Sequence, residues 1–175
     1  MKTKVIDNFL PQEEFENIKN MIAYNTKFPF YHQSYVSHDP RIVFDENTCQ
    51  PWNWYLIHLF YNYDAPISTY CQHIVETFVP KFQELEIFKS MIRIKANLYP
   101  YTEIIREHSP HVDYSFSHHS AIYSINTCDG FTKLDDGTKI DSVENRILFF
   151  DGNNLHNSST TSNAMGRYNI NFNFL

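Results

Sequence analysis

The chain has 175 residues, of which 42% are hydrophobic and 17% aromatic, enough for one well-packed domain and too little for two of ordinary size. A net charge of -6 with 19% charged residues gives no broad basic face, so a general nucleic-acid binder is not expected. The apolar runs are far shorter than the ~20 residues of a membrane span, and residues 1–10 lack a signal peptide's apolar core. Cys49, Cys71 and Cys128 form no CxxC pair, which favours reduced thiols and a cytoplasmic protein.

The first half of the chain predicts two helices. One begins after Pro11, where proline and following acidic residues match a helix start, and its apolar residues recur at helical spacing: Phe15, Ile18, Met21 and Ile22. A second helix is expected from Pro66 to Val79, capped by Asp64 and ended by Pro80. Its buried stripe would comprise Ile67, Tyr70, Ile74, Val75 and Phe78.

The segment between these helices, residues 28–63, is aromatic-rich and is expected to be irregular. Within it, residues 32–39 and Trp52-Asn53-Trp54 are candidates for a substrate lid, although the tryptophans would serve equally well as a cap on the core. Residues 1–90 are thus expected to provide helical and lid-forming support.

The second half, residues 91–175, predicts short strands that form the core of the single domain. Met91 to Tyr99 alternates apolar and mixed polar residues with a period of two. A tight hairpin is expected at Asp135-Asp136-Gly137. Further strands are expected at residues 121–127, 131–134, 138–140, 147–150 and 167–175. The fold class is therefore mainly β, a sandwich or barrel with N-terminal helices packed outside.

Three residues indicate a metal site: His111, Asp113 and a distal histidine, His156. In an extended strand, residues i and i+2 project to the same side, so His111 and Asp113 can bind one ion together. Two histidines and one carboxylate leave octahedral positions open, which suits ferrous iron. Zinc is a weaker choice, because its catalytic sites of this composition usually come with a helical motif that this chain lacks.

The ordered set of motifs resembles the 2-oxoglutarate and iron(II)-dependent dioxygenases, in particular their prolyl 4-hydroxylase-like branch. His156 follows the HxD motif's first histidine by 45 residues, and Arg167 follows His156 by 11, which is similar to the family's spacing. The surrounding sequence segments are also similar to those of the family: Leu98-Tyr99-Pro100, residues 122–126, residues 148–150 and Arg167-Tyr168. The resemblance covers roughly residues 92–174.

This resemblance implies a double-stranded β-helix (a jelly roll, cupin-like) with the metal at its open end. It further implies Fe(II), 2-oxoglutarate and O2 as cofactors, with ascorbate as a candidate reductant. Arg167 would pair with the distal carboxylate of 2-oxoglutarate, and Tyr99 would bind the same group. A second family tyrosine falls at Ser124, with Tyr123 one place away on the other face.

Several residues are candidates for lining the pocket. The face of the last strand that carries Arg167 also carries asparagines, and the resemblance directs this face into the barrel: Asn169, Asn171 and Asn173. Asn97, Tyr123 and Ser124 are further candidates, and His108 is the neighbouring histidine expected to touch substrate. His118 and His119 are expected at the rim, and Arg93 and Lys95 are expected to direct their charges to solvent.

The leading function is an oxygenase that hydroxylates a peptide residue, prolyl-like, or a small amino-acid-like molecule, with release of succinate and CO2. One alternative is a non-catalytic cupin-like metal-binding module. Another is a nucleic-acid demethylase, which is disfavoured because asparagines occupy the positions where that branch carries a further arginine. Substrate identity and oligomeric state are not readable from the sequence.

Overall fold

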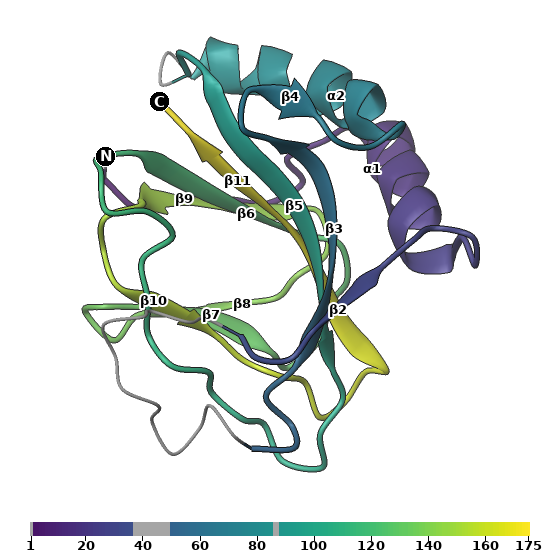
Figure 1. Cartoon of the computed structure of the whole chain (residues 1–175), viewed down its shortest axis with the longest axis vertical. Helices are drawn as coiled ribbons and strands as arrows, with labels where there is room; N and C mark the ends of the chain where they lie inside the picture. The colour runs from purple at the N-terminus through teal and green to yellow at the C-terminus, as the bar shows by residue number, and fades with distance from the viewer. Residues whose placement is uncertain (1, 37–49, 86–87) are drawn as a thin grey trace.

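A computed structural model describes residues 2–36, 50–85 and 88–175 of the chain. Two antiparallel β-sheets face each other, and two helices cover the outer face of the larger sheet (Figure 1). The larger sheet has the order β1-β9-β6-β11-β5-β3-β2, with β4 paired to β3, and the smaller sheet has the order β10-β7-β8. This arrangement is a double-stranded β-helix, as expected. No helix within the described ranges is long and apolar enough to span a membrane.

The larger sheet is built from eight strands: β1 (Lys4–Ile6), β2 (Tyr31–Gln33), β3 (Tyr55–Asn62), β4 (Ala65–Pro66), β5 (Met91–Pro100), β6 (His119–Ser124), β9 (Arg146–Asp151) and β11 (Gly166–Phe174). The smaller sheet contains β7 (Phe131–Leu134), β8 (Lys139–Asp141) and β10 (His156–Ser158). The expected hairpin joins β7 to β8, where Gly137 adopts a φ of 85°. The strand at residues 121–127 starts earlier and ends at Ser124, and β10 was not anticipated.

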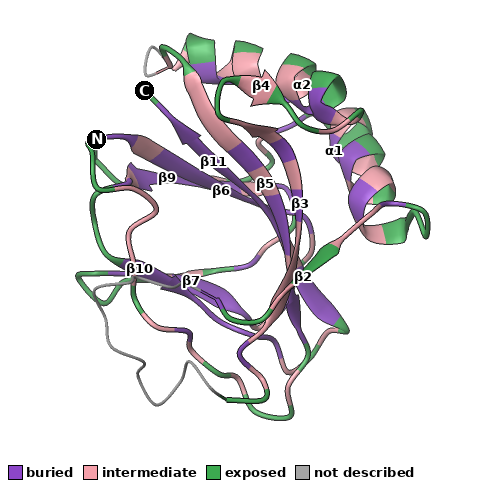
Figure 2. Cartoon of the chain, in the orientation of Figure 1, coloured by how far each residue is buried: buried purple, intermediate pink, exposed green. Residues whose placement is uncertain are grey.

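Strand β11 lies at the centre of the larger sheet, between β5 and β6, and is buried along nearly all of its length (Figure 2). Its even-numbered side chains pack in the main core beneath the helices: Tyr168, Ile170, Phe172 and Phe174. Its odd-numbered side chains, Arg167 and the three asparagines, are also buried, on the side of the sheet that faces the smaller sheet. The alternation read from the sequence thus separates an apolar core from a polar interior.

Helix α1 (Gln12–Lys19) continues as one π-helical turn, Asn20–Tyr24, and buries the apolar residues that its periodicity predicted. Helix α2 (Cys71–Glu84) begins later than expected and runs past Pro80. The expected cap at Asp64 and the burial of Ile67 were wrong, because Ala65–Pro66 pairs with β3 and Ile67 lies exposed. Tertiary packing explains the continuation past proline, since Phe82 in the last turn is fully buried against Phe149, Phe172 and Phe174.

The expectation of an irregular segment at residues 28–63 was also wrong. Strand β3 runs through eight of these residues and pairs with β5 over most of its length, and β2 forms the sheet edge beside it. The β3 sequence is rich in Tyr, Leu, Ile and Phe, the residues that favour a pleated, half-buried surface. Residues 37–49, which include part of the proposed lid, lie outside the described residues.

Candidate metal centre and cavity

His111, Asp113 and His156 come together inside the barrel, as the spacing predicted. The backbones of His111 and His156 form a reciprocal bridge, in which each N–H donates to the other's carbonyl at 2.9 and 3.0 Å. Asp113 follows two residues later, and one donor atom from each of the three side chains lies within 4.8 Å of the others. This is the only group of three potential metal ligands among the residues that the structure describes.

Both histidines are prepared as metal ligands by burial and by a local contact. Burial and the nearby His156 lower the pKa of His111 to about 4, and burial also lowers the pKa of His156, so both rings are neutral. The Nδ1 atom of His111 lies 3.4 Å from the Ser109 carbonyl, and that of His156 lies 3.2 Å from the Asn154 carbonyl. A proton held on Nδ1 by these contacts leaves the lone pair of Nε2 free to bind a metal ion. Two neutral imidazoles and a carboxylate fit Fe(II).

Asp113 is held as a carboxylate by its neighbours. Arg93 Nη2 donates to its Oδ1 at 2.7 Å, and the amides of Asn173 and Asn171 donate to its Oδ2 at 2.9 and 3.3 Å. Burial alone would raise the pKa of Asp113, yet the positive charge of Arg93 holds that pKa well below its usual range. The carboxylate is therefore ionised and oriented before any metal binds.

A small cavity adjoins the three candidate ligands and extends between the two sheets. Its other lining residues are mostly polar: Lys95, Asn97, Tyr99, Ile122, Thr132, Asn157, Ser158, Asn169 and Asn171. The β11 residues face β5 in register, with Asn169 opposite Asn97 and Asn171 opposite Lys95. Asn97 Nδ2 donates to Asn169 Oδ1 at 2.8 Å. The predicted pocket residues Asn97, Asn169 and Asn171 are therefore placed together beside the metal ligands.

Arg167 is only 1% exposed and lies just beyond the cavity lining, on the face of β11 that also carries Asn169 and Asn171. Its guanidinium donates to Ser142 Oγ at 2.6 Å and to Thr132 Oγ1 at 2.8 Å, and its charge lies 5.4 Å from the ring centroid of Tyr99. Thr132 and Tyr99 both line the cavity. Because a guanidinium has five N–H donors, it retains donors for a carboxylate in this geometry.

Two other predicted pocket residues lie elsewhere. Tyr123 faces the helices, packs against Phe78 with ring centroids 4.9 Å apart, and donates its hydroxyl to Asn145 Oδ1 at 2.9 Å. It is therefore a core residue, and its assignment to the pocket was wrong. Ser124 shares the inward face with Asn169, its partner across β6 and β11, but is not among the cavity-lining residues.

His108 lies just outside the cavity wall. Its ring centroid is 5.3 Å from that of Tyr99 and 5.7 Å from that of Trp52, and its Nδ1 is 2.9 Å from Ser158 Oγ. Trp52 therefore lies close to the site, as a lid residue would, but it contacts His108 and not the metal ligands. His108 also lines a second hollow of ≈ 400 Å³, which shares Asn157 with the cavity.

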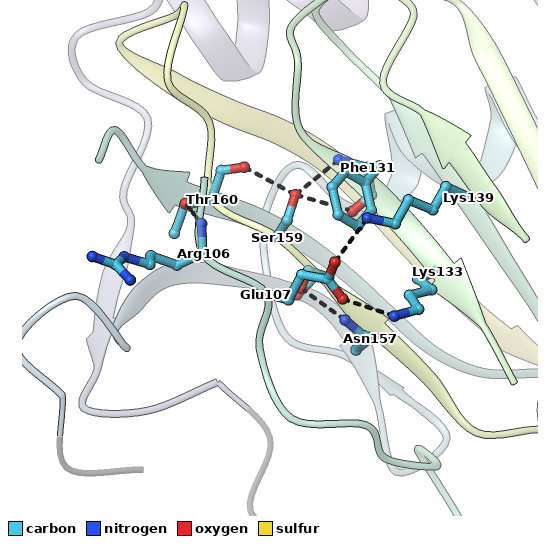
Figure 3. A network of polar contacts seen from close by, with 9 residues as sticks. Arg106, Glu107, Phe131, Lys133, Lys139, Asn157, Ser159 and Thr160 are labelled. Carbon is cyan, nitrogen blue, oxygen red and sulfur yellow. Dashed lines mark hydrogen bonds and ion pairs between the residues drawn. The ribbon is translucent and has the colours of Figure 1, made fainter. Parts of the chain in front are cut away.

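Polar contacts hold the loop that carries the HxD motif against the smaller sheet (Figure 3). Glu107 pairs with Lys133 at 3.1 Å and Lys139 at 2.8 Å, so that one carboxylate joins the loop to both β7 and β8. The backbone N–H of Arg106 donates to Thr160 Oγ1 at 2.8 Å. These contacts fix the loop before His111 and thereby position the first metal ligand.

Two site residues were missed at the sequence level. Arg93 and Lys95 were expected to extend to solvent, but Arg93 pairs with Asp113 and Lys95 lines the cavity. Burial and the nearby Arg93 lower the pKa of Lys95 to about 7. The signal was present in the alternation of β5, because both residues share a face with Asn97 and Tyr99.

No family model and no curated protein matches the chain. Several solved structures, in contrast, match the fold of the chain. A prolyl hydroxylase from Trichoplax adhaerens, in complex with a hypoxia inducible factor peptide fragment, has a TM-score of 0.67 at 16% identity over 98% of this chain and 83% of its own. The viral collagen prolyl hydroxylase of Paramecium bursaria Chlorella virus-1, in complex with 2OG, has a TM-score of 0.65 at 12% identity over 100% of this chain and 97% of its own.

A 2OG-Fe(II) oxygenase family protein from Burkholderia pseudomallei has a TM-score of 0.70 at 9% identity, covering 98% of this chain and 84% of its own. The chain has the fold of the prolyl hydroxylases and 2OG-Fe(II) oxygenases. The expected fold is thereby confirmed, whereas the reaction has to be argued from the site.

Proposed function

We propose that this protein is a 2-oxoglutarate- and Fe(II)-dependent oxygenase that hydroxylates a peptide residue, prolyl-like, or a small amino-acid-like molecule. The observation that carries the proposal is the convergence of His111, Asp113 and His156 at a cavity whose lining residues Thr132 and Tyr99 contact the buried guanidinium of Arg167. When bound, iron and 2-oxoglutarate would supply oxidative decarboxylation to succinate and CO2 coupled to substrate hydroxylation.

The protein's own residues would have three tasks. The three ligands would hold the ion from one side, leaving positions open toward the cavity. Arg167, with Tyr99 beside it, would fix the distal carboxylate of the cosubstrate by charge-assisted hydrogen bonds. The buried walls of the barrel would exclude bulk water and restrict which C–H bond reaches the metal.

A substrate of peptide or small-molecule size is consistent with the comparisons. The Trichoplax adhaerens neighbour is described as a complex with a peptide fragment. In this chain the hollow beside His108 shares one lining residue, Asn157, with the cavity, and its ≈ 400 Å³ would accommodate part of a larger substrate next to the site.

The decisive experiment is an anaerobic titration of metal-free protein with Fe(II) and then 2-oxoglutarate, monitored by the visible charge-transfer absorption of the chelate. We expect this absorption in the wild type and its loss in His156→Ala, with both proteins folded by circular dichroism. Tight iron binding without the absorption would refute the oxygenase and favour the cupin-like metal-binding module. Appearance of the same absorption in His156→Ala would refute the ligand assignment.

A further inference from the structure

The cavity contains an amine that makes no hydrogen bond or ion pair with the described residues. Lys95 projects from β5 into the cavity, and across residues 2–36, 50–85 and 88–175 its amine has no hydrogen-bond or ion-pair partner. Its recorded contact is with the ring of Tyr55, whose centroid lies 5.4 Å away. The neighbouring cation differs, because Arg93 is compensated by Asp113 at 2.7 Å. A half-buried amine that lacks a hydrogen-bond partner is stabilised when a ligand supplies an acceptor.

The same wall presents two hydrogen-bond acceptors without donors. Asn97 and Asn171 are 2% and 6% exposed, and the Oδ1 atom of each is buried with no hydrogen-bond partner. Their amide nitrogens are already used, by Asn169 and by Asp113. Because buried amide oxygens are normally paired, these two atoms indicate a ligand that carries N–H or O–H donors.

Lys95 lines the cavity, whereas Arg167 lies beyond its lining, against Thr132 and Tyr99. Arg167 lies opposite Tyr99 in the pairing of β11 with β5, whereas Lys95 lies opposite Asn171. Four residues of extended strand separate the two levels, which is about 13 Å between backbones. A carboxylate paired with Arg167 and a carboxylate paired with Lys95 would therefore lie at different levels of the barrel, the second one near the metal ligands.

We propose that Lys95 binds the carboxylate of the organic substrate, while Asn97 and Asn171 accept hydrogen bonds from its ammonium or hydroxyl group. This inference rests on the function proposed above and narrows it. The substrate is then a small amino-acid-like carboxylic acid, and not an internal residue of a peptide, which has no carboxylate on its main chain.

The test compares carboxylic acids with their uncharged amides. Anaerobic calorimetry on protein saturated with Fe(II) and 2-oxoglutarate would measure binding of the twenty free amino acids and of their C-terminal amides. We expect at least one acid to bind, and its amide to bind about ten- to a hundred-fold more weakly, the range expected for one hydrogen bond to a charged group. Binding of none of the acids, or equal binding of acid and amide, would overturn the inference.

Variants assign the effect to Lys95. In Lys95→Met the affinity for the acid should fall to that of the amide, whereas Lys27→Met, an exposed lysine in a turn, should leave it unchanged. Lys95→Met should unfold at the same temperature as wild type or higher, because it removes an unpaired amine. An acid affinity unchanged in the folded Lys95→Met variant would overturn the assignment.

The 2-oxoglutarate titration separates the possible failures. We expect Lys95→Met to bind 2-oxoglutarate within threefold of wild type, since Arg167 serves that carboxylate. A tenfold or greater loss would place the cosubstrate on Lys95 and overturn the substrate assignment. If the wild type gives no charge-transfer absorption, the proposed function itself fails; if it gives the absorption but shows no acid preference, only this inference fails.

Discussion

Arg93 forms a 2.7 Å ion pair with Asp113, the residue that also offers a carboxylate to the candidate metal centre. The two side chains are 17% and 7% exposed, so the pair is largely shielded from solvent. In the metal-free protein the guanidinium therefore performs part of the charge compensation that a metal cation would otherwise provide. Metal affinity and stability are coupled through this pair.

Replacing Arg93 with Gln should reveal this coupling. The metal-free variant should lose about 3 kcal/mol of unfolding free energy, because a buried carboxylate loses its cation. Added Fe(II) under anaerobic conditions should restore more stability to the variant than to wild type. Urea unfolding with and without metal would measure both effects. Arg106→Gln, at an exposed arginine, is the control, and equal metal-induced stabilisation of Arg93→Gln and wild type would contradict the coupling.

Gly130 controls the position of Arg167. A Cβ added at Gly130 would lie 2.7 Å from Arg167 Cδ and 2.8 Å from the Thr160 carbonyl oxygen. Gly130→Ala should therefore cost about 1–3 kcal/mol of stability and displace the guanidinium. We expect weaker binding of 2-oxoglutarate with unchanged binding of Fe(II), because the contacts of Arg167 are with Ser142, Thr132 and Tyr99 and not with the metal ligands. Spectroscopic titration of each ligand would check this, and unaltered 2-oxoglutarate affinity would argue against the role of Arg167.

Tyr123→Phe tests the relocation of Tyr123 from pocket to core. Loss of its hydrogen bond to Asn145 should cost about 1 kcal/mol of unfolding free energy, since the acceptor is buried. Asn145 also binds the backbone N–H and carbonyl of Leu10, so the effect extends to the entry of α1. Affinity for 2-oxoglutarate should not change. A variant of unchanged stability that binds 2-oxoglutarate more weakly would instead indicate that Tyr123 lines the pocket.

We expect His58 to lower the free energy of unfolding in acid, independently of the metal centre. Its ring lies 2.7 Å from both the Pro29 carbonyl and Ser68 Oγ, and burial lowers its pKa below the usual 6.5. The unfolded chain therefore binds the proton more tightly, so this contribution is complete above pH 6.5 and declines as the pH falls toward the folded-state pKa. Through this one group the free energy of unfolding changes by at most ~1.4 kcal/mol per pH unit.

Urea unfolding of metal-free protein at pH 7.5 and pH 5 would measure this decline. His58→Gln should show a smaller difference between the two pH values than wild type, although its stability at pH 7.5 is lower. An identical pH dependence in both proteins would remove His58 as the cause.

Much of the site was predictable because short-range chemistry specified it. The HxD spacing correctly predicted that His111 and Asp113 come together, although they lie on a loop with an isolated bridge at His111 and not on a strand. The alternation after Arg167 placed the asparagines inward. The roles of Arg93 and Lys95 were missed because a strand pattern defines a face but not how deep that face is buried. The loop that carries Asp113 and the opposing smaller sheet cover that face, and both are distant from β5 in the sequence.

The helical half was harder to predict for the same reason. Pro80 is a valid stop signal in isolation, yet the aromatic contacts of Phe82, made with residues far away in the chain, outweigh the lost backbone hydrogen bond. Strand β3 was overlooked because its aromatic run lacks the regular polar alternation of an exposed strand, although its composition favours β structure.

The two-sided character of β11 constrains how the protein can change over evolutionary time. A one-residue insertion or deletion in this strand would exchange its amide row with its aromatic row, leaving phenyl rings beside the metal ligands and amides beneath the helices. Single substitutions at the odd-numbered positions disturb only one side. New substrate preferences can therefore arise in this barrel by exchange of side chains on a strand of fixed length and register.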